Sequence, residues 1–460
     1  MVLRLTVSKA LGKLRLTGNS CYILTNTKQI VRKRLDQPKR LISSSAIRRQ
    51  EPKTGEINTS FDPHYSMINA CPLTNDMVFN DPSKLGRVAA YRVLNQDGTV
   101  GAPLDHDLTP EKVIELYKGM VLNNMLDKIA YDSQRQGRIS FYMTSFGEEA
   151  AVFGSASAIC KEDWIYAQYR EAGALLQRGM SVKSMMAQCY GTHEDMGKGR
   201  QMPIHYGSKE LNYVTLSSPL TTQLPQAVGT AYSFKLNKNN QEKRIVLCYF
   251  GEGAASEGDA HAAMNFAATL SCPVIFFCRN NGYAISTATR DQYVSDGIVT
   301  RGVGYGINSI RVDGNDLFAV YAATREARRI CADESRPVLI EAMTYRVGHH
   351  STSDDSLAYR DVSEINQWEQ KASPIKRIYN YLLRNRLWSE SEDNEIRDRA
   401  REQVIEAINH AEKQKRLPIT TMFDDVYDEL PANLRRQRDE LERHLELYGE
   451  HYPIDQHEGI

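Results

Sequence analysis

The chain has 460 residues, enough for one large domain with additions or for two domains. Hydrophobic residues make up 41% of the chain and charged residues 25%, which argues against a disordered or fibrous protein. The 57 basic and 57 acidic residues leave no net charge, which argues against a general nucleic-acid-binding protein. No apolar run reaches about 18 residues, so we expect no membrane span. The eight cysteines lack CxxC spacing and are predicted to be reduced thiols.

The first 49 residues differ in composition from the rest of the chain. They contain 12 arginine and lysine residues and many hydroxyl side chains, against a single acid, Asp36. A basic, hydroxyl-rich and acid-poor N-terminus is typical of a mitochondrial transit peptide. We therefore predict that residues 1–49 are a transit peptide and that the protein works in the mitochondrial matrix. A basic arm that binds an acidic partner is the alternative interpretation.

The next segment, residues 50–108, is predicted to be an extended arm. It is rich in Pro, Asn, Asp and Gly, and only residues 87–94 resemble a strand. A helix is expected to begin at Thr109, because this capping hydroxyl is followed by Pro110 and then by an acid in the first turn. The apolar face of this helix should continue to Ile129.

Residues 109–361 are predicted to form an α/β domain in which a parallel sheet is covered by helices on both faces. Short apolar runs that suit strands buried on both faces lie at 164–168, 244–250, 273–278 and 338–345. Segments long enough for crossover helices, such as 257–270 and 316–331, alternate with them, as in βαβ units. Residues 362–460 are charged and are predicted to form a helical C-terminal region that packs on partner subunits.

Two of the predicted strands are followed by residues that suit a metal ion. Residues 251–254 read Gly-Glu-Gly-Ala after one strand, and residues 279–283 read Arg-Asn-Asn-Gly-Tyr after the next. A right-handed crossover places these strands near each other, so their ends should converge where ligands bind to such sheets. Glu252, Asn281 and the carbonyl group of Tyr283 offer the hard oxygen ligands that Mg²⁺ prefers.

The same loops also suit a diphosphate. Gly251, Gly253 and Ala254 are small enough for the backbone to approach it, a helix that begins just after them would favour an anion, and Arg279 adds a positive charge. Each loop alone is equally an ordinary tight turn. The pair is more specific, because Gly-acid-Gly followed by 26 residues and then Asn-Asn resembles the thiamine diphosphate and magnesium motif. Glu252 stands where Asp is commoner, so the metal position or the loop would shift.

Three further motifs extend this resemblance. They are Ala-Gln-Tyr-Arg-Glu-Ala-Gly from Ala167, Ser-Ser-Pro-Leu-Thr-Thr-Gln from Ser217, and Tyr-Arg-Val-Gly-His-His-Ser-Thr-Ser-Asp-Asp from Tyr345. Together with the two strand-end loops, they make the chain from Phe61 to Gln456 resemble the α subunits of branched-chain 2-oxo acid dehydrogenases. This resemblance implies the thiamine diphosphate-binding fold.

The resemblance also implies roles for individual residues. Those implied to contact thiamine diphosphate are Tyr169, Arg170, Ser218, Leu220, Gly251, Gly253, Ala254, Arg279 and His350. Those implied to bind Mg²⁺ are Glu252, Asn281 and the Tyr283 carbonyl group. Those implied to bind K⁺ are Ser217, Pro219, Thr222 and Gln223. Leu220 would press on the cofactor rings, and the alternative interpretation of its loop is a helix cap formed by Ser218.

His350 is predicted to be the catalytic residue, in preference to His349. A histidine with a pKa near neutrality can donate or accept a proton at physiological pH, and the resemblance implies that His350 assists the acylation of a lipoyl group. Ser351 is the hypothesised phosphorylation site, because a phosphate next to His350 would add about −1.5 to −2 charge beside a bound diphosphate. The second phosphoserine of the family falls at Asp361, so that site is in doubt.

By this resemblance, the chain takes part in the oxidative decarboxylation of branched-chain 2-oxo acids and acylates the lipoyl group of an acyltransferase core. The glutamate that activates the aminopyrimidine belongs to the β subunit in this family, so an α₂β₂ heterotetramer is expected. A regulatory kinase and a phosphatase are further expected partners. The alternatives are a pyruvate dehydrogenase α subunit, a non-catalytic paralogue that binds the cofactor, and a self-sufficient transketolase-like enzyme.

Overall fold

The computed structural model describes residues 75–103, 107–237 and 243–459. The chain divides into two units, Met1–Asn80 and Asp81–Ile460, and the elements below belong to the second unit. The predicted transit peptide and residues 50–74 and 104–106 of the predicted extended arm lie outside the described residues. The six cysteines of the described residues are all free thiols, as predicted.

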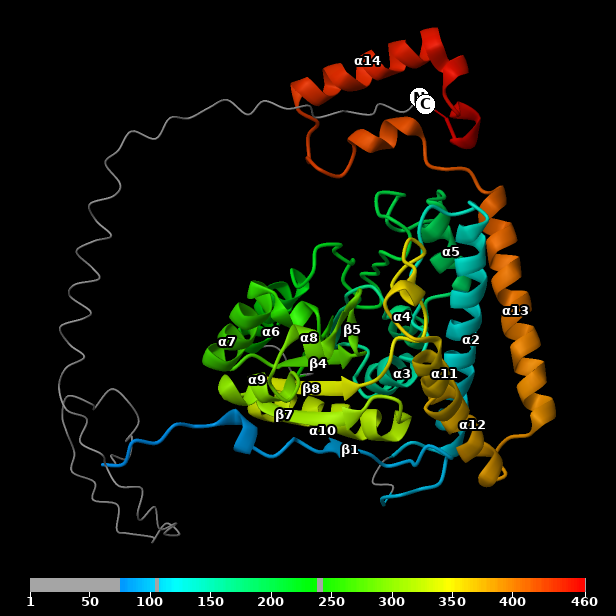
Figure 1. The fold of residues 1–460 in the computed structure, drawn as a ribbon. Coiled ribbons are helices and arrows are strands. Elements are labelled where there is room, and N and C mark those ends of the chain that lie inside the picture. Colours follow the sequence, from blue (N-terminus) through cyan, green and yellow to red (C-terminus); the bar gives the residue numbers. More distant parts are fainter. Residues whose placement is uncertain (1–74, 104–106, 238–242, 460) are drawn as a thin grey trace, which may run out of the picture. The chain divides into compact units, whose positions relative to one another are not determined.

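Within the described residues, a six-stranded parallel sheet has the order β1-β7-β8-β4-β3-β2. Its strands are β1 (Ala90–Tyr91), β2 (Trp164–Tyr166), β3 (Val246–Gly251), β4 (Val274–Asn280), β7 (Asn308–Asp313) and β8 (Val338–Met343). Figure 1 shows β4, β8 and β7 side by side. A small antiparallel pair is formed by β5 (Tyr283–Ala284) and β6 (Thr287–Ala288). The predicted parallel sheet is therefore confirmed.

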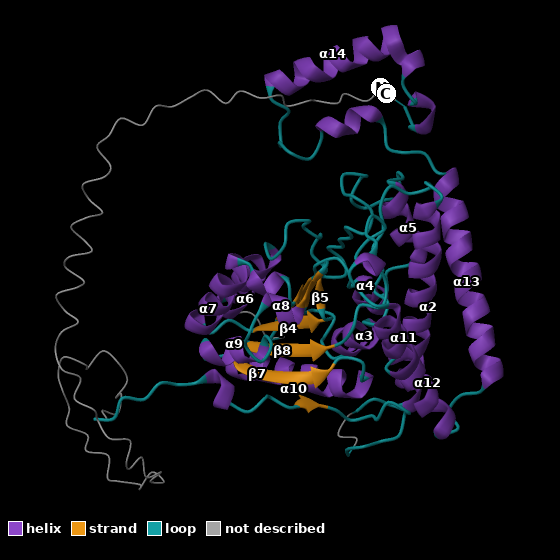
Figure 2. Cartoon of the chain, in the orientation of Figure 1, coloured by secondary structure: helices purple, strands orange, loops and turns teal. Residues whose placement is uncertain are grey.

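Strand β3 shows why the apolar runs become central strands. Leu247 and Tyr249 pack into the core on one face of the sheet, whereas Val246, Cys248 and Phe250 pack into a separate core on the other face. Successive side chains of a strand point to opposite faces, so a strand buried on both sides must be apolar throughout. Figure 2 shows helices on both sides of the strands, which confirms the predicted layers.

Two sets of helices provide these cores. The face of the sheet on which Leu247 lies is covered by α2 (Pro110–Arg135), α3 (Glu149–Ser157), α4 (Ala172–Arg178), α5 (Val182–Tyr190), α10 (Leu317–Glu334) and α13 (Glu390–Lys413). The opposite face of the sheet, on which Val246 lies, is covered by α6 (Gln223–Leu236) and α7 (Gly258–Leu270). The remaining α-helices are α8 (Thr289–Gln292), α9 (Val299–Gly304), α11 (Val362–Lys371), α12 (Pro374–Arg384) and α14 (Ala432–Tyr448). The 3-10 helices are η2 (Pro82–Lys84), η3 (Ala254–Ser256), η4 (Ser356–Ala358), η5 (Ile419–Phe423), η6 (Gly449–His451) and η7 (Ile454–Gln456).

The predicted start of the first long helix is confirmed. The side chain of Thr109 accepts a hydrogen bond from the backbone N–H of Lys112 at 3.3 Å, and Pro110 is the first residue of α2. The helix continues to Arg135, beyond the expected end at Ile129, and Ala130 and Ser133 in its last turns are buried. The helix packs against α3, α4 and α13. Tertiary packing, not the capping pattern, therefore sets the length of α2.

Strand β7 was not predicted. Four of its six side chains are only partly buried, so its sequence Asn-Ser-Ile-Arg-Val-Asp lacks the continuous apolar character of β3 and β4. The strand-like segment 87–94 contributes only the two residues of β1, which pair with β7 at the edge of the sheet. Edge positions need less burial than central ones, so apolar patterns do not identify them.

The C-terminal region is helical, as predicted. Helix α13 packs on α2 and α5, whereas α14 has a single buried residue, Leu445. None of the described helices has both the length and the apolar character needed to cross a membrane.

Asp316 connects the N-terminal part of this unit to the sheet. One carboxylate oxygen accepts hydrogen bonds from the backbone N–H groups of Phe318 and Ala319 and so caps α10. The other accepts from the backbone N–H groups of Val93 at 2.6 Å and Leu94 at 2.7 Å. All these groups are buried, so one carboxylate fixes both a helix end and an irregular segment more than 200 residues away in sequence.

We predict that Asp316→Ala lowers the free energy of unfolding by about 3 kcal/mol, because the helix loses its cap and two buried N–H groups lose their acceptor. Asp361→Ala is the matched control, since Asp361 caps α11 at an exposed position and its loss should cost about 1 kcal/mol. Denaturant unfolding of the two variants measures the difference. Equal losses in the free energy of unfolding would contradict the double role assigned to the Asp316 carboxylate.

Candidate functional site

Four of the sequence motifs meet at one edge of the sheet. Strands β2, β3, β4 and β8 are consecutive neighbours, and Gly251 at the end of β3 lies opposite Arg279 near the end of β4. Residues 167–171 follow β2, and residues 344–351 follow β8. Because parallel strands end at the same edge, all four loops emerge together, which confirms the predicted convergence.

The predicted magnesium ligands lie in contact with one another. Glu252 is 1% exposed, and its Oε2 atom accepts a hydrogen bond from the backbone N–H of Asn281 at 3.2 Å. Its other oxygen, Oε1, is buried and has no hydrogen-bond partner among the described residues. Burial raises the pKa of the Glu252 carboxyl group to about 7. A cation at Oε1 would satisfy this oxygen and favour the ionised form, so these residues fit a bound metal ion.

Glycines let the loops around Glu252 approach closely. A Cβ atom on Gly253 would lie 2.7 Å from the Cβ atom of Ala284, so a larger side chain would push the two loops apart. Gly282 has a φ of +90°, which permits the sharp turn between Asn281 and β5. The backbone N–H of Gly251 donates to Oε1 of Gln168 at 2.9 Å and ties the end of β3 to the loop after β2.

Ala254 is buried at the start of η3, and α7 begins at Gly258. The predicted anion-favouring helix therefore starts as a short 3-10 turn before the α-helix.

Arg279 belongs to a buried ion cluster. Its Nη1 atom lies 2.5 Å from Glu148, and its Nε atom contacts Glu171. The other oxygen of Glu148 accepts a hydrogen bond from the Asn281 side chain at 2.9 Å and lies 3.9 Å from Nε of Arg170. The positive charge of Arg279 is thus balanced within the protein, and the cluster holds the metal-ligand candidate Asn281. Contact between Arg279 and a diphosphate stays a prediction.

Glu148 and Glu171 were not identified as site residues from the sequence. Glu148 stands just before α3, in which Glu149 is followed by the apolar run Ala-Ala-Val-Phe-Gly, and a carboxylate beside such a buried segment needs a partner. Glu171 stands within the Tyr-Arg-Glu motif itself. Both signals indicated buried acids, but neither could identify Arg279 as the partner.

His350 lies between two arginines. Nη2 of Arg170 lies 3.1 Å from Nδ1 of His350 and also donates to the His350 carbonyl oxygen at 2.7 Å. Nη1 of Arg346 lies 3.4 Å from the same Nδ1 atom. The Tyr169 ring meets the imidazole edge-on at 6.0 Å, and Asp354 accepts from the His350 backbone N–H at 2.7 Å. The predicted residues Tyr169, Arg170 and His350 are therefore brought together.

This environment sets the charge of His350. Burial, followed by repulsion from Arg170 and Arg346, lowers the pKa of the His350 imidazole to about 3. These surroundings alone therefore do not give His350 the near-neutral pKa that suits proton transfer at physiological pH. Because guanidinium groups only donate hydrogen bonds, Nδ1 is the acceptor and the ring proton lies on Nε2. Negative charge brought to the two arginines would raise this pKa.

His349 has different neighbours. Its Nδ1 atom lies 2.9 Å from Oγ of Ser356 and accepts from the Ser356 backbone N–H at 3.0 Å, while its ring stacks on Tyr131. These contacts hold the loop after β8, so they are consistent with a supporting role for His349.

The predicted potassium ligands lie in one loop before α6. Oγ1 of Thr222 is 3.0 Å from Oγ of Ser217 and 3.2 Å from the carbonyl oxygen of Pro219. The Gln223 side chain is buried and donates to the carbonyl oxygen of Tyr249 in β3 at 3.1 Å. Three of the four residues thus gather oxygen atoms at one place, and the fourth ties the loop to the sheet.

Ser218 and Leu220 are exposed in the same loop. Leu220 is 40% exposed, a large value for an apolar side chain beside a site. The hydroxyl group of Ser218 pairs with His205 at 2.6 Å. The alternative that Ser218 caps a helix is wrong, because α6 begins at Gln223 after Thr222. Among the described residues, no hydrogen bond connects either side chain to Glu252 or His350.

Ser351 is 8% exposed and lies in a tethered loop. Its Oγ accepts from the backbone N–H of Ser353 at 3.2 Å, and the next residue, Thr352, donates its backbone N–H to the carbonyl oxygen of Tyr142 at 3.1 Å. Asp361 stands where the second phosphoserine of the family falls. Its side chain caps α11 by accepting a hydrogen bond from the backbone N–H of Ser363 at 2.7 Å.

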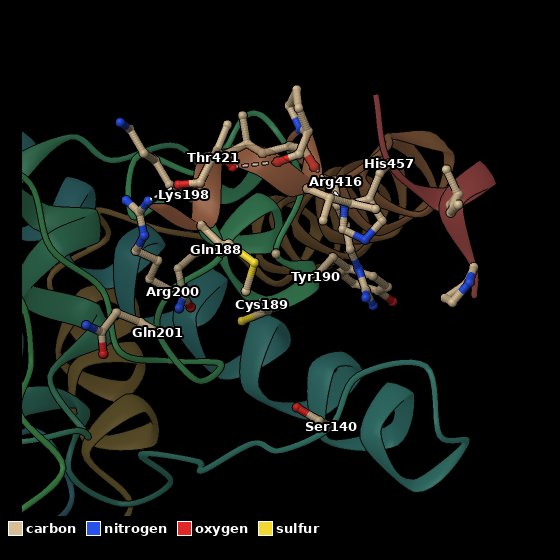
Figure 3. A pocket seen from close by; sticks show the side chains of 18 of the residues that line it. Ser140, Gln188, Cys189, Tyr190, Lys198, Arg200, Gln201, Arg416, Thr421 and His457 are labelled. Carbon is tan, nitrogen blue, oxygen red and sulfur yellow. Dashed lines mark hydrogen bonds between the residues drawn. The ribbon is translucent and has the colours of Figure 1, made fainter. Parts of the chain in front are cut away.

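A cavity of about 790 Å³ lies elsewhere, where α5 and residues 198–203 face the C-terminal segment (Figure 3). It is basic, but Lys198 and Arg200 both pair with Asp425. None of the predicted site residues lines this cavity. The volume of a cavity therefore does not identify the candidate site in this protein. The convergence of the strand ends identifies it.

The fold is that of a thiamine diphosphate-binding dehydrogenase component. Residues 117–420 match the family described as dehydrogenase E1 component, and the chain belongs to that family. Membership of this family implies thiamine diphosphate as the cofactor.

Individual relatives are similar over most of their length. The chain is 57% identical to the mitochondrial 2-oxoisovalerate dehydrogenase subunit alpha of Homo sapiens over 378 residues, which cover 82% of this chain and 84% of the human protein. It is 53% identical to the protein of the same name from Pan troglodytes over 415 residues, covering 90% of this chain and 92% of that one. It is 58% identical to that of Caenorhabditis elegans over 365 residues, covering 79% and 84%.

We predict that Arg279→Met destabilises the fold by about 3–5 kcal/mol, because Glu171 would be left buried without its cation and Glu148 would keep only Arg170, 3.9 Å away. Arg329→Met is the control, since Arg329 pairs with Glu326 at an exposed position and its loss should cost less than about 1 kcal/mol. Thermal unfolding compares the two variants. A loss for Arg279→Met no larger than that of the control would show that the cluster does not stabilise the fold.

Proposed function

We propose that this chain is the cofactor-binding α subunit of a mitochondrial dehydrogenase that decarboxylates branched-chain 2-oxo acids and transfers the acyl group to a lipoyl group. The observation that carries the proposal is the buried, unpartnered Oε1 atom of Glu252, next to Asn281. This pair stands in a chain 53–58% identical to proteins named as 2-oxoisovalerate dehydrogenase subunit alpha. The remaining residues are assigned roles that agree with their contacts.

Glu252, Asn281 and the carbonyl group of Tyr283 are proposed to bind Mg²⁺ and, through it, the diphosphate. Bound thiamine diphosphate supplies the electron sink that the decarboxylation of a 2-oxo acid requires. Gly251, Gly253 and Ala254 are proposed to give the backbone close access to the diphosphate, and the missing side chain at Gly253 also lets its loop pack against Ala284. Leu220 offers an exposed apolar side chain to the cofactor rings.

A potassium ion is proposed in the loop before α6. Ser217, Pro219, Thr222 and Gln223 are its proposed ligands, and hydroxyl and carbonyl oxygens are hard donors that suit such a cation. The short distances among three of these residues support the proposal. The ion would stiffen the loop that carries Ser218 and Leu220.

Tyr169, Arg170, Arg279 and His350 are the remaining proposed contacts of the cofactor, and His350 is the proposed catalytic residue. Its Nε2 atom carries the ring proton, so an uncharged His350 presents a hydrogen-bond donor to the reacting groups. A diphosphate near Arg170 would offset positive charge and bring the imidazole closer to titration. His350 would then supply a proton during the acylation of the lipoyl group.

The proposed partners are a β subunit, an acyltransferase core that bears the lipoyl group, and a regulatory kinase and phosphatase. Residues 362–460 are proposed to pack on partner subunits, and α14, which buries only Leu445 within the described residues, supports this proposal. We further propose that residues 1–49 direct the chain to the mitochondrial matrix, that residues 50–108 form an arm, and that residues 109–361 bind the cofactor.

The test is to co-express residues from about 50 onward with the β subunit and measure thiamine diphosphate-dependent decarboxylation of 3-methyl-2-oxobutanoate and pyruvate. We expect a strong preference for the branched acid and no turnover without β. Glu252→Gln should abolish Mg²⁺-dependent cofactor binding, since the amide removes the charged ligand. Glu257→Gln, which changes an exposed glutamate beside η3, should bind the cofactor normally.

Each other outcome would favour one of the alternative functions. Preference for pyruvate would keep the site and replace the substrate. Cofactor binding without turnover of either acid would indicate a non-catalytic paralogue, and turnover without β would indicate a self-sufficient enzyme.

We predict that stoichiometric phosphorylation of Ser351 abolishes lipoyl acylation. A phosphate does not fit at a position that is 8% exposed, so the loop that holds His350 must open. Ser351→Glu should imitate this loss, whereas Ser353→Glu, at an exposed position two residues later, should stay active. Acylation of a lipoylated acceptor domain measures both, and full activity of the phosphorylated enzyme would refute the hypothesis.

A further inference from the structure

His205 is a buried histidine outside the sequence motifs, and it contacts a predicted cofactor-binding residue. It lies between α5 and α6 with 6% of its surface exposed. Its Nε2 atom is 2.6 Å from Oγ of Ser218, and its Nδ1 atom is 3.1 Å from the carbonyl oxygen of Pro203. The ring therefore bridges a backbone carbonyl group and the hydroxyl group of Ser218.

For the uncharged imidazole, the two contacts determine the direction of the hydrogen bond to Ser218. An uncharged imidazole carries a single N–H group, and a carbonyl oxygen can only accept. The ring proton therefore lies on Nδ1 and is donated to Pro203. Nε2 is left as an acceptor, so the hydroxyl group of Ser218 donates its only hydrogen to His205.

This leaves Ser218 as an acceptor toward its surroundings. The lone pairs of its oxygen face away from His205, on a side chain that is exposed, as is that of Leu220 two residues later. A group that approaches Ser218 from the open side meets a hydrogen-bond acceptor and no donor. An N–H donor suits this position, and a second acceptor does not.

The backbone around the pair is strained. Ile204, next to His205, has a φ of +69°, and Thr221, three residues after Ser218, has a φ of +66°. Both are β-branched residues, for which positive φ is unfavourable. Such conformations persist where the surroundings fix them, often at ligand sites. The side chain of Ile204 is buried, which holds His205 in place.

We propose that His205 is a positioning residue that holds the Ser218 hydroxyl group as the acceptor for an N–H donor of the bound cofactor. The aminopyrimidine of thiamine diphosphate is the chemical class that supplies such a donor beside Leu220. The inference rests on the proposed function, because it assumes that the cofactor binds on the side of Ser218 that points away from His205. His205 acts through Ser218 and does not touch the reacting atoms.

The experiment compares amide substitutions of the ring in the assembled α–β protein. In His205→Gln, the longer amide reaches the position of Nε2 and accepts from Ser218. In His205→Asn, the shorter amide reaches only the position of Nδ1 and pairs with Pro203. Thiamine diphosphate affinity, measured by titration calorimetry with Mg²⁺ present, is compared for these variants, for Ser218→Ala and for each double variant.

We expect His205→Asn and Ser218→Ala each to weaken cofactor binding about tenfold, as the loss of one hydrogen bond predicts. The double variant His205→Asn with Ser218→Ala should bind no more weakly than either single one, and His205→Gln should bind like the wild type. Additive losses, or equal losses for Asn and Gln at position 205, would overturn the positioning role.

A wild-type protein that fails to bind thiamine diphosphate would overturn the proposed function and this inference together. Normal binding by the wild type with an uncoupled pair would overturn the inference alone. Unfolding temperatures measured without cofactor serve as the control for folding, and His205→Gln and Ser218→Ala keep the test decisive if His205→Asn is unstable.

Discussion

Arg279 reaches the interior from β4 and meets two carboxylates that come from other parts of the chain. Glu148 precedes α3 and Glu171 follows β2, so three segments must pack together before any of these charges is balanced. A buried charge without a partner is strongly destabilising, which makes this cluster a condition for the arrangement around it. Through Glu148 the cluster also holds Asn281 and lies next to Arg170. The metal-ligand candidates and the histidine pocket therefore depend on the same buried charges.

Among the described residues of this arrangement, a few groups are left unpaired or exposed. Oε1 of Glu252 is buried and unpaired, Leu220 is exposed, and Ser218 offers its lone pairs outward. These three features differ in chemistry: one suits a cation, one an apolar ring and one an N–H donor. A cofactor that carries a metal-bound diphosphate and an amino-substituted ring would satisfy all three. Glu252 stands on a loop at this edge of the sheet, and Ser218 and Leu220 stand on the loop before α6, which Gln223 ties to β3.

Much of the fold could be predicted, because central strands and capped helices leave local signals. The apolar runs correspond to β2, β3, β4 and β8, and Thr109 followed by Pro110 marked the start of α2. The missed strand β7 is only partly buried and lies near the sheet edge, so its composition carries no such signal. The end of α2 was also missed, since packing against other helices extends it to Arg135.

The sequence by itself determined which chemical groups follow each strand, and hence the family and the kind of cofactor. The tertiary structure alone decided which partner each group takes. It paired Arg279 with carboxylates, and it placed Arg170 beside His350, 180 residues away in sequence, where burial and two positive charges keep the imidazole uncharged. It also brought His205 against Ser218. Desolvation and Coulomb energy depend on distances in space, which sequence spacing does not specify.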